Sequence, residues 1–279
     1  MKRTRGPLSL VLSYLVLTAL ALLFLAPVVM MLVGSLKPDE RVLVEAGSLA
    51  AFIPTGASLQ NYADVFRRTD FLRFLFNSVF ITGTIVASGL LVNSLAAYAF
   101  ARLQWRGREL LFNLVLALMI LPFEAIAVPL FYGVSILGLR DTYLAQILPF
   151  IADAFSVFLF YTFFIGLPKE LEEAAHLDGA SVLRTFFTII VPNARPVFAS
   201  VAILTFLTRW GTYLWPLMVT IGPKVRPLPV AIASFYTLPP LQWGDILAFG
   251  AMMVTPVLVV FLIFQRWFVR GVAASAIKG

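Results

Sequence analysis

Six apolar runs, each long enough to cross a lipid bilayer as a helix, constrain this sequence more than any other feature. They lie near residues 8–33, 76–101, 110–133, 141–166, 197–221 and 245–270. A span needs about 20 apolar residues, and inside a bilayer a helix satisfies all of its own backbone hydrogen bonds. Hydrophobic residues make up 61% of the chain and charged residues 13%, which excludes an ordinary soluble domain. We therefore predict an all-α polytopic membrane protein with six transmembrane helices.

No linker, low-complexity tract or clear repeat divides the chain. We therefore expect residues 1–279 to form a single transmembrane domain. The first apolar run follows Lys2, Arg3 and Arg5, as the apolar region of a signal peptide would. A signal peptide has an apolar region of only about 7–15 residues, so this longer run is predicted to remain as the first span.

Lysine and arginine are distributed unevenly between the predicted loops. With a cytoplasmic N-terminus, twelve of the 21 basic residues fall on the cytoplasmic side, at the two ends and in the loops 102–109 and 167–196. Eight fall on the opposite side, five of them in the long loop 34–75, and long loops contribute little to orientation. The bias predicts that both termini and the 167–196 loop are cytoplasmic. Because the basic residues are dispersed between apolar runs, the net charge of +7 indicates a membrane lipid environment and no nucleic acid partner.

The residue types that are missing exclude several kinds of chemistry. The chain contains no cysteine, so disulfides, thiol nucleophiles and thiolate metal sites are excluded. His176 is the only histidine, and by itself it cannot build a zinc or haem site. No G-x-x-x-x-G-K-[ST] sequence occurs, so the chain lacks the usual phosphate-binding loop of a transport ATPase.

The loop 167–196 is unusual because helix-forming, charged sequence lies between two strongly apolar runs. Acidic residues gather at its start, which suits the positive end of a helix dipole. Asp178-Gly179 then breaks the chain, Ser181 is placed to cap a second helix, and Pro192 ends that helix. The second helix has an apolar face made of Leu183, Phe186, Phe187 and Ile190. A pair of short helices with such a face indicates a docking element for another protein.

The spacing within this loop resembles a known signature. Glu173-Ala174-Ala175 is followed after three residues by Gly179, and after nine more by Ile189, one residue and Val191-Pro192. This pattern is similar to the EAA signature of permease subunits of binding-protein-dependent ABC importers, which has leucine where this chain has Val191. The carbohydrate importers, and in particular the second, six-helix permease of a maltose-type pair, are the most similar. Shorter pieces extend the resemblance over nearly the whole chain: Asn61-Tyr62, Asn77-Ser78, Ala97-Tyr98-Ala99, Pro122-Phe123-Glu124, Leu214-Trp215-Pro216-Leu217, Gln265-Arg266 and Lys278-Gly279.

The resemblance implies the following organisation. The chain would be one half of a permease heterodimer in a bacterial or archaeal inner membrane, with no enzyme activity and no cofactor of its own. ATP and Mg would bind a dimer of separate ATP-binding subunits, and an extracytoplasmic substrate-binding protein would deliver a sugar. The 167–196 segment would act as a cytoplasmic coupling-helix loop. Its ATPase-coupling residues would be Glu173, Ala174, Ala175, Asp178, Gly179, Ile189 and Pro192.

Three charged residues fall near the middle of consecutive predicted spans, namely Glu124, Asp153 and Arg209. Charges at that depth are costly and usually face a bundle interior or a watery cavity. With aromatic and hydroxyl side chains nearby, they form a candidate substrate path: Glu124, Asp153, Thr205, Arg209, Tyr213 and Trp215. Gln146 and Val157 would share a helix face with Asp153. A structural ion pair between Arg209 and a carboxylate explains the charges equally well. The related permeases often have Trp-Asn where this chain has Trp210-Gly211.

Two other classes of function, a secondary transporter and an intramembrane protease, explain the sequence less well. A proton-coupled secondary transporter would use Glu124 and Asp153 as carriers, but it leaves the docking loop unexplained and no inverted repeat is evident. An intramembrane protease would need clustered metal ligands or a base next to a serine, and the single histidine lies in a loop.

In the loop 222–244, aromatic residues suit either contact with a substrate-binding protein or anchoring of helix ends. The sequence leaves the sugar unidentified.

Overall fold

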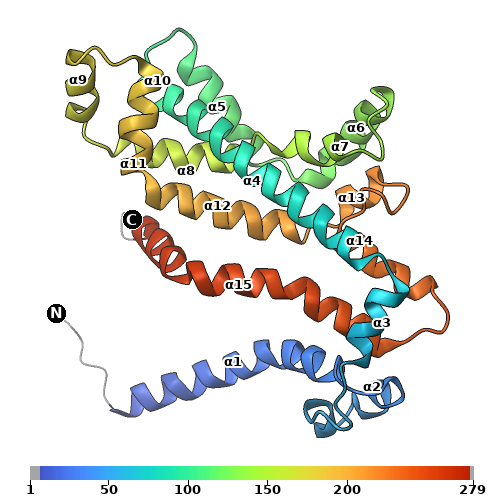
Figure 1. The fold of residues 1–279 in the computed structure, drawn as a ribbon. Helices are drawn as coiled ribbons and strands as arrows, with labels where there is room; N and C mark the ends of the chain where they lie inside the picture. Colours follow the sequence, from blue (N-terminus) through green and yellow to red (C-terminus); the bar gives the residue numbers. More distant parts are fainter. Residues whose placement is uncertain (1–6, 277–279) are drawn as a thin grey trace. The chain divides into compact units, whose positions relative to one another are not determined.

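The computed structural model describes residues 7–276, with side chains over 9–264, and these residues form helices without any strand (Figure 1). Lys2, Arg3, Arg5 and the terminal Lys278-Gly279 lie outside the described residues, as do the side chains of Gln265 and Arg266. By length and composition, four of the helices can cross a membrane, or up to six if each of two bent helix pairs counts as one span. The prediction of an all-helical membrane protein is therefore confirmed.

The chain divides into two compact units. Unit 1 comprises residues 1–72 and 232–255, and unit 2 comprises residues 73–231 and 256–279. The prediction of one domain over 1–279 stays a prediction. Two long helices run through both ranges: α4 (Phe71–Arg102) and α15 (Trp243–Ala276).

Unit 1 contains the first span and a folded extramembrane region. Its remaining helices are α1 (Pro7–Gly34), α2 (Asp39–Glu45), η1 (Leu49–Phe52), α3 (Gln60–Arg68) and η4 (Ile232–Thr237). Phe71 and Phe235 pack edge-on against Phe249, with ring centroids 5.1 and 5.5 Å away. The predicted loop 34–75 thus contains three short helices, α2, η1 and α3.

A buried ion pair stabilises this region of unit 1. The Lys37 ammonium, with only 2% of the side chain exposed, lies 2.7 Å from a Glu45 carboxylate oxygen and also donates to the carbonyl of Ala50. The hydrogen bond from Lys37 lowers the pKa of Glu45 below its ordinary value. A carboxylate with a lowered pKa stabilises the fold at pH values above its ordinary pKa, and that contribution is lost as the pH falls through the lowered value.

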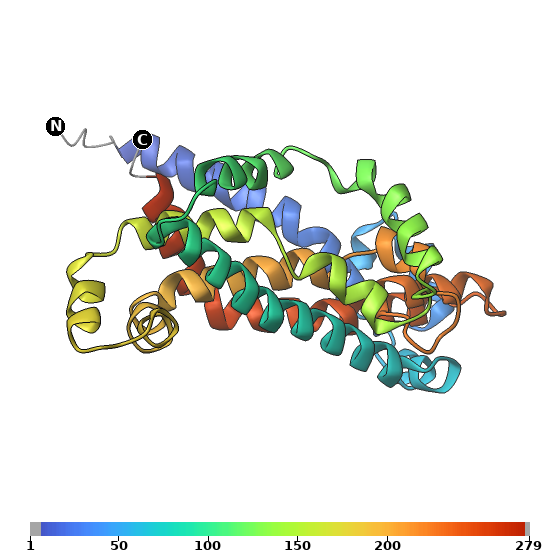
Figure 2. The same ribbon diagram turned by 90° about the horizontal axis from the view of Figure 1, so that it is seen from above.

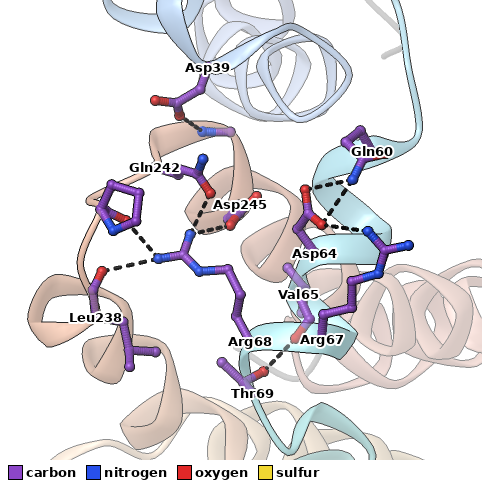
Figure 3. Close-up of polar contacts among 12 residues, drawn as sticks. Asp39, Gln60, Asp64, Val65, Arg67, Arg68, Thr69, Leu238, Gln242 and Asp245 are labelled. Carbon is purple, nitrogen blue, oxygen red and sulfur yellow. Dashed lines mark hydrogen bonds and ion pairs between the residues drawn. The ribbon is translucent and has the colours of Figure 1, made fainter.

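Arg68 at the end of α3 joins the start of α15 to α3 within unit 1 (Figure 3). Its guanidinium donates to the carboxylate of Asp245, to the side-chain oxygen of Gln242 at 2.6 Å, and to the carbonyls of Leu238 and Pro240. Asp245 is 1% exposed, so Arg68 neutralises a carboxylate that is shielded from water. The preceding Arg67 differs, because its side chain is 71% exposed and pairs only with Asp64 one turn earlier.

Unit 2 contains the predicted spans 76–101, 110–133, 141–166 and 197–221, and the second part of 245–270. Its elements besides α4 and α15 are α5 (Arg108–Leu118), α6 (Phe123–Ile136), α7 (Tyr143–Ile147), η2 (Leu148–Phe150), α8 (Ala154–Ile165), α9 (Glu170–Leu177), α10 (Val182–Thr185), η3 (Phe186–Ile190), α11 (Val191–Asn193), α12 (Arg195–Trp210), α13 (Leu214–Val219) and α14 (Leu228–Ala231). Both views place the α9–α11 segment and the α4–α5 loop at one end of this unit, with α6 and α13 at the other (Figures 1 and 2).

Three predicted spans of unit 2 are interrupted, and one of them is 197–221, which is divided into α12 and α13 at residues 211–213. For the 110–133 span, Pro122 and Pro129 on either side of Glu124 predict a kink. The chain bends by 103° between α5 and α6, at a break that ends on Pro122, which has no backbone N–H to continue the helix. The predicted 141–166 span is interrupted between Phe150 and Ala154, where the Asn93 side chain donates to the carbonyl of Ile151 and accepts from the backbone N–H of Asp153. The expectation that Gln146, Asp153 and Val157 share one helix face is wrong for this reason.

Replacing Arg68 by methionine is expected to destabilise the protein by about 3–5 kcal/mol, because it leaves the Asp245 carboxylate buried without a partner. Arg67→Met is the matched control and is expected to cost less than about 1 kcal/mol, since that pair is exposed. Thermal unfolding of the detergent-purified protein measures both. The double variant Arg68→Met with Asp245→Leu should recover much of the loss. Equal unfolding midpoints for the two single variants would contradict this account.

Candidate functional site

Helix α9 lies at one end of unit 2, and most of its residues are exposed. Glu170, Glu172 and Glu173 occupy its first turn, where they oppose the positive end of the helix dipole. The helix ends at a tight turn in which Gly179 has a φ of +75°, and the Ala180 N–H donates to the carbonyl of Ala175 at 2.9 Å. Because few residues other than glycine adopt that φ, the turn requires Gly179. Ser181 then caps α10 by accepting from the Arg184 N–H, as its position in the sequence predicts.

The outer face of this segment is unusually apolar for a surface turn. Leu177 is 90% exposed, Leu183 61% and Phe187 50%. Glu173, Ala174, His176 and Asp178 are exposed beside them, whereas Ala175 is buried against the protein. Clustered apolar side chains at a surface are characteristic of interaction sites. We call Leu177, Leu183 and Phe187 the apolar face of the 167–196 segment.

The opposite face of the segment is anchored to the end of α4. The Glu172 carboxylate lies 3.0 Å from the Arg102 guanidinium, and their side chains are 13% and 4% exposed. The hydroxyl of Tyr98 donates to the other oxygen of Glu172 at 3.4 Å, and Arg102 also donates to the carbonyl of Leu167. The sequence does not distinguish Glu172 from its acidic neighbours, so neither it nor Arg102 is among the predicted site residues.

A π-helical turn, η3, divides the apolar face that the sequence predicts for the second helix. Phe186 is 1% exposed and Ile190 is fully buried, whereas Leu183 and Phe187 point to solvent. The Phe186 ring lies 5.2 Å from the Tyr98 ring, within a core that also includes Phe164. The expectation that all four residues form one face is therefore wrong. Two of them fix the segment to α4 and α8, and the other two remain available to a partner.

The remaining predicted coupling residues lie further along the same segment. Ile189 is half-buried in η3, and Pro192 is exposed in α11. The segment therefore consists of an exposed first helix, a glycine turn, and a second helix with buried side chains. This second helix is followed directly by α12.

The charged residues of the predicted path lie in two places in unit 2: Asp153 and Arg209 form a half-exposed pair, and Glu124 lies apart from them. Asp153 caps α8, where one carboxylate oxygen accepts from both the N–H and the hydroxyl of Ser156. Its other oxygen is 3.8 Å from the Arg209 guanidinium, which lies over the Phe150 ring at 4.2 Å. Glu124 is exposed at the start of α6 and lies outside this pair.

The aromatic and hydroxyl residues of the predicted path also differ in their surroundings. Trp215 is fully buried and donates its indole N–H to the carbonyl of Ala145, so it belongs to the packed core. Tyr213 is 45% exposed and Thr205 is half-buried. Gln146 is 1% exposed and donates to the carbonyl of Val225, while its side-chain oxygen has no hydrogen-bond partner. Gln146, Arg209 and Trp215 line one small cavity.

Among the described residues, no group of three His, Asp or Glu side chains is arranged to hold a metal ion. The candidate site therefore consists of the apolar face of the 167–196 segment and the half-exposed Asp153–Arg209 pair.

Comparison with known proteins gives consistent results. Residues 89–274 match the family described as binding-protein-dependent transport system inner membrane component. An arabinooligosaccharides transport system permease protein of Halalkalibacterium halodurans is 35% identical over 283 residues, covering all of both chains. A trehalose/maltose transport system permease protein of Thermococcus litoralis is 32% identical over 265 residues, covering 93% of this chain and 94% of the relative.

The fold also has a solved counterpart. A bacterial ABC transporter involved in importing the acidic polysaccharide alginate contains a chain that superimposes with a TM-score of 0.83 and 23% identity, covering 92% of this chain and 95% of that one. At this level of identity the likeness concerns the fold.

Proposed function

Because the chain belongs to the family of inner membrane components of binding-protein-dependent transport systems, we propose that it is a permease subunit of an ATP-driven carbohydrate importer. In this proposal the chain forms half of the translocation path, and a related second permease forms the other half. A substrate-binding protein delivers the sugar from outside. Relatives named for arabinooligosaccharide and for trehalose/maltose transport support a carbohydrate substrate.

The observation that carries the coupling proposal is the exposed apolar face of the 167–196 segment. Leu177, Leu183 and Phe187 form a surface suited to a hydrophobic groove on an ATP-binding subunit. The neighbouring Glu173 offers an acceptor to a basic group or an amide at the rim of that groove. The chain has no phosphate-binding loop of its own, so ATP and Mg act on the partner subunit. This arrangement requires the 167–196 segment and both termini to be cytoplasmic, in line with the charge distribution.

The other coupling residues have roles that follow from their positions. Ala174 permits close approach of a partner, while buried Ala175 allows α9 to lie against the protein. Asp178 and Gly179 form the turn that sets the direction of the second helix. Ile189 and Pro192 connect that helix to α12, so a displacement of α9 is passed to a membrane span as a rigid-body rotation.

The path proposal places sugar against the Asp153–Arg209 pair, with Thr205 and Tyr213 contributing hydroxyl groups. Their partial exposure supports this assignment. Glu124 is exposed and would lie at the entrance to the path, whereas buried Trp215 would shape the wall without touching sugar. The long 3.8 Å separation leaves the guanidinium room to bind a sugar hydroxyl.

Replacing Leu177 by aspartate is expected to weaken binding of the ATP-binding subunit by about 2 kcal/mol, or roughly 30-fold, because it puts a charge in the centre of the docking surface. Gly179→Pro should have the same effect, since proline cannot adopt the positive φ. Co-purification of the ATP-binding subunit and binding-protein-stimulated ATPase activity measure the loss. Leu49→Asp is the matched control, an 84% exposed leucine in unit 1. Normal co-purification with Leu177→Asp and Gly179→Pro would contradict the assignment.

The path is tested by Arg209→Met and Asp153→Asn. Asparagine also caps helices, so Asp153→Asn removes the charge while keeping the start of α8. If these residues bind sugar, the assembled importer should form normally while sugar uptake falls or changes in preference by about tenfold, the effect of one charge-assisted hydrogen bond. Uptake of labelled sugars into proteoliposomes measures this. Loss of assembly with both variants would instead establish the pair as a structural contact and refute the path.

A further inference from the structure

A cavity of about 350 Å³ lies between α4, α5 and α8 in unit 2, and neither Asp153 nor Arg209 lines it. Three aromatic side chains form its apolar wall: the Phe112 ring is 4.0 Å from the Tyr161 ring and 5.4 Å from the Phe100 ring, centroid to centroid. Arg108, Glu109 and Asn113 complete the lining. The cavity therefore joins an aromatic surface to a polar, charged rim.

The rim carries one charge of each sign on consecutive residues. Arg108 is half-buried, and one of its nitrogens donates to the carbonyl of Leu103 at 3.2 Å. Glu109 is exposed. Within the part of the chain that the structure describes, no ion pair is recorded for either residue, so the guanidinium retains free donors and the carboxylate retains free acceptors.

The location of the cavity indicates a membrane ligand. Arg108 and Glu109 are the first two residues of α5, and the helix then exposes Leu110, Leu111 and Leu114 by 66%, 48% and 54%. Exposed leucines along an apolar helix suit contact with lipid acyl chains. The charged rim thus lies where the helix passes from a basic loop into the hydrocarbon, which is the depth of phospholipid headgroups.

We propose that this cavity binds a zwitterionic phospholipid that has a primary amine headgroup. The phosphate lies against Arg108, the ammonium group against Glu109, and the glycerol and first acyl carbons against the rings of Phe100 and Phe112. Adjacent opposite charges match the two charges of this headgroup. An anionic headgroup would satisfy Arg108 but would meet the Glu109 carboxylate, so the site should discriminate against it.

The proposal is tested by native mass spectrometry of the full-length protein. The protein is purified in detergent and given equal amounts of phosphatidylethanolamine and phosphatidylglycerol. The wild-type protein should retain phosphatidylethanolamine about fivefold better, the effect of one favourable surface charge. Arg108→Gln should weaken both lipids. Glu109→Gln should abolish the preference by improving retention of phosphatidylglycerol. Arg106→Gln is the matched control, because Arg106 is exposed and does not line the cavity.

Several results would overturn this inference. Equal retention of the two lipids by the wild-type protein would do so, as would indistinguishable behaviour of the Arg108, Glu109 and Arg106 variants. Retention of neither lipid would also overturn it. Arg108 and Glu109 are in the first turn of α5 and Arg106 is in the loop before it, and circular dichroism checks that each variant keeps its helices.

Discussion

The contact between Arg102 and Glu172 is the interaction on which the proposed coupling depends. Both side chains are nearly withdrawn from water, so each neutralises a charge that would be costly alone. The same arginine donates to the carbonyl of Leu167, so the end of α4 holds both the chain entering α9 and the first turn of α9 itself. With Phe186 packed on Tyr98, the segment is fixed to the span on one face and open to a partner on the other.

In the proposed coupling, this anchoring allows a short helix to transmit force. An isolated eight-residue helix is unstable in water, and α9 has eight residues. Its position is determined by the buried carboxylate and by the glycine turn that follows it. The second helix then continues through buried residues into α12, so displacement of α9 has a path into the membrane spans. The π-helical turn at Phe186–Ile190 makes the two-sided arrangement possible, because it separates the buried side chains from the exposed ones.

The sequence predicts much of this architecture, since long apolar runs and basic loops are local signals. The helices near 8–33 and 76–101 are observed as Pro7–Gly34 and Phe71–Arg102. Pro122 and Pro129 indicate the kink in the 110–133 span, which is observed as the bend between α5 and α6. The break within the 141–166 span does not follow from the sequence, because it depends on contacts of the distant Asn93 with the 151–153 backbone. For the candidate site, Gly179 and Ser181 follow from local turn and capping rules. Glu172 does not, because only the folded chain shows which of three neighbouring glutamates turns inward.

The most direct test of the account is hydrogen exchange in residues 170–177 of the purified protein. Arg102→Met and Glu172→Gln should each accelerate exchange there, because either change releases α9 from the end of α4. Glu173→Gln is the matched control, since that neighbouring glutamate is exposed, and it should leave exchange unchanged. Equal exchange rates in the wild-type protein and in the Arg102 and Glu172 variants would contradict the claim that this pair fixes the segment.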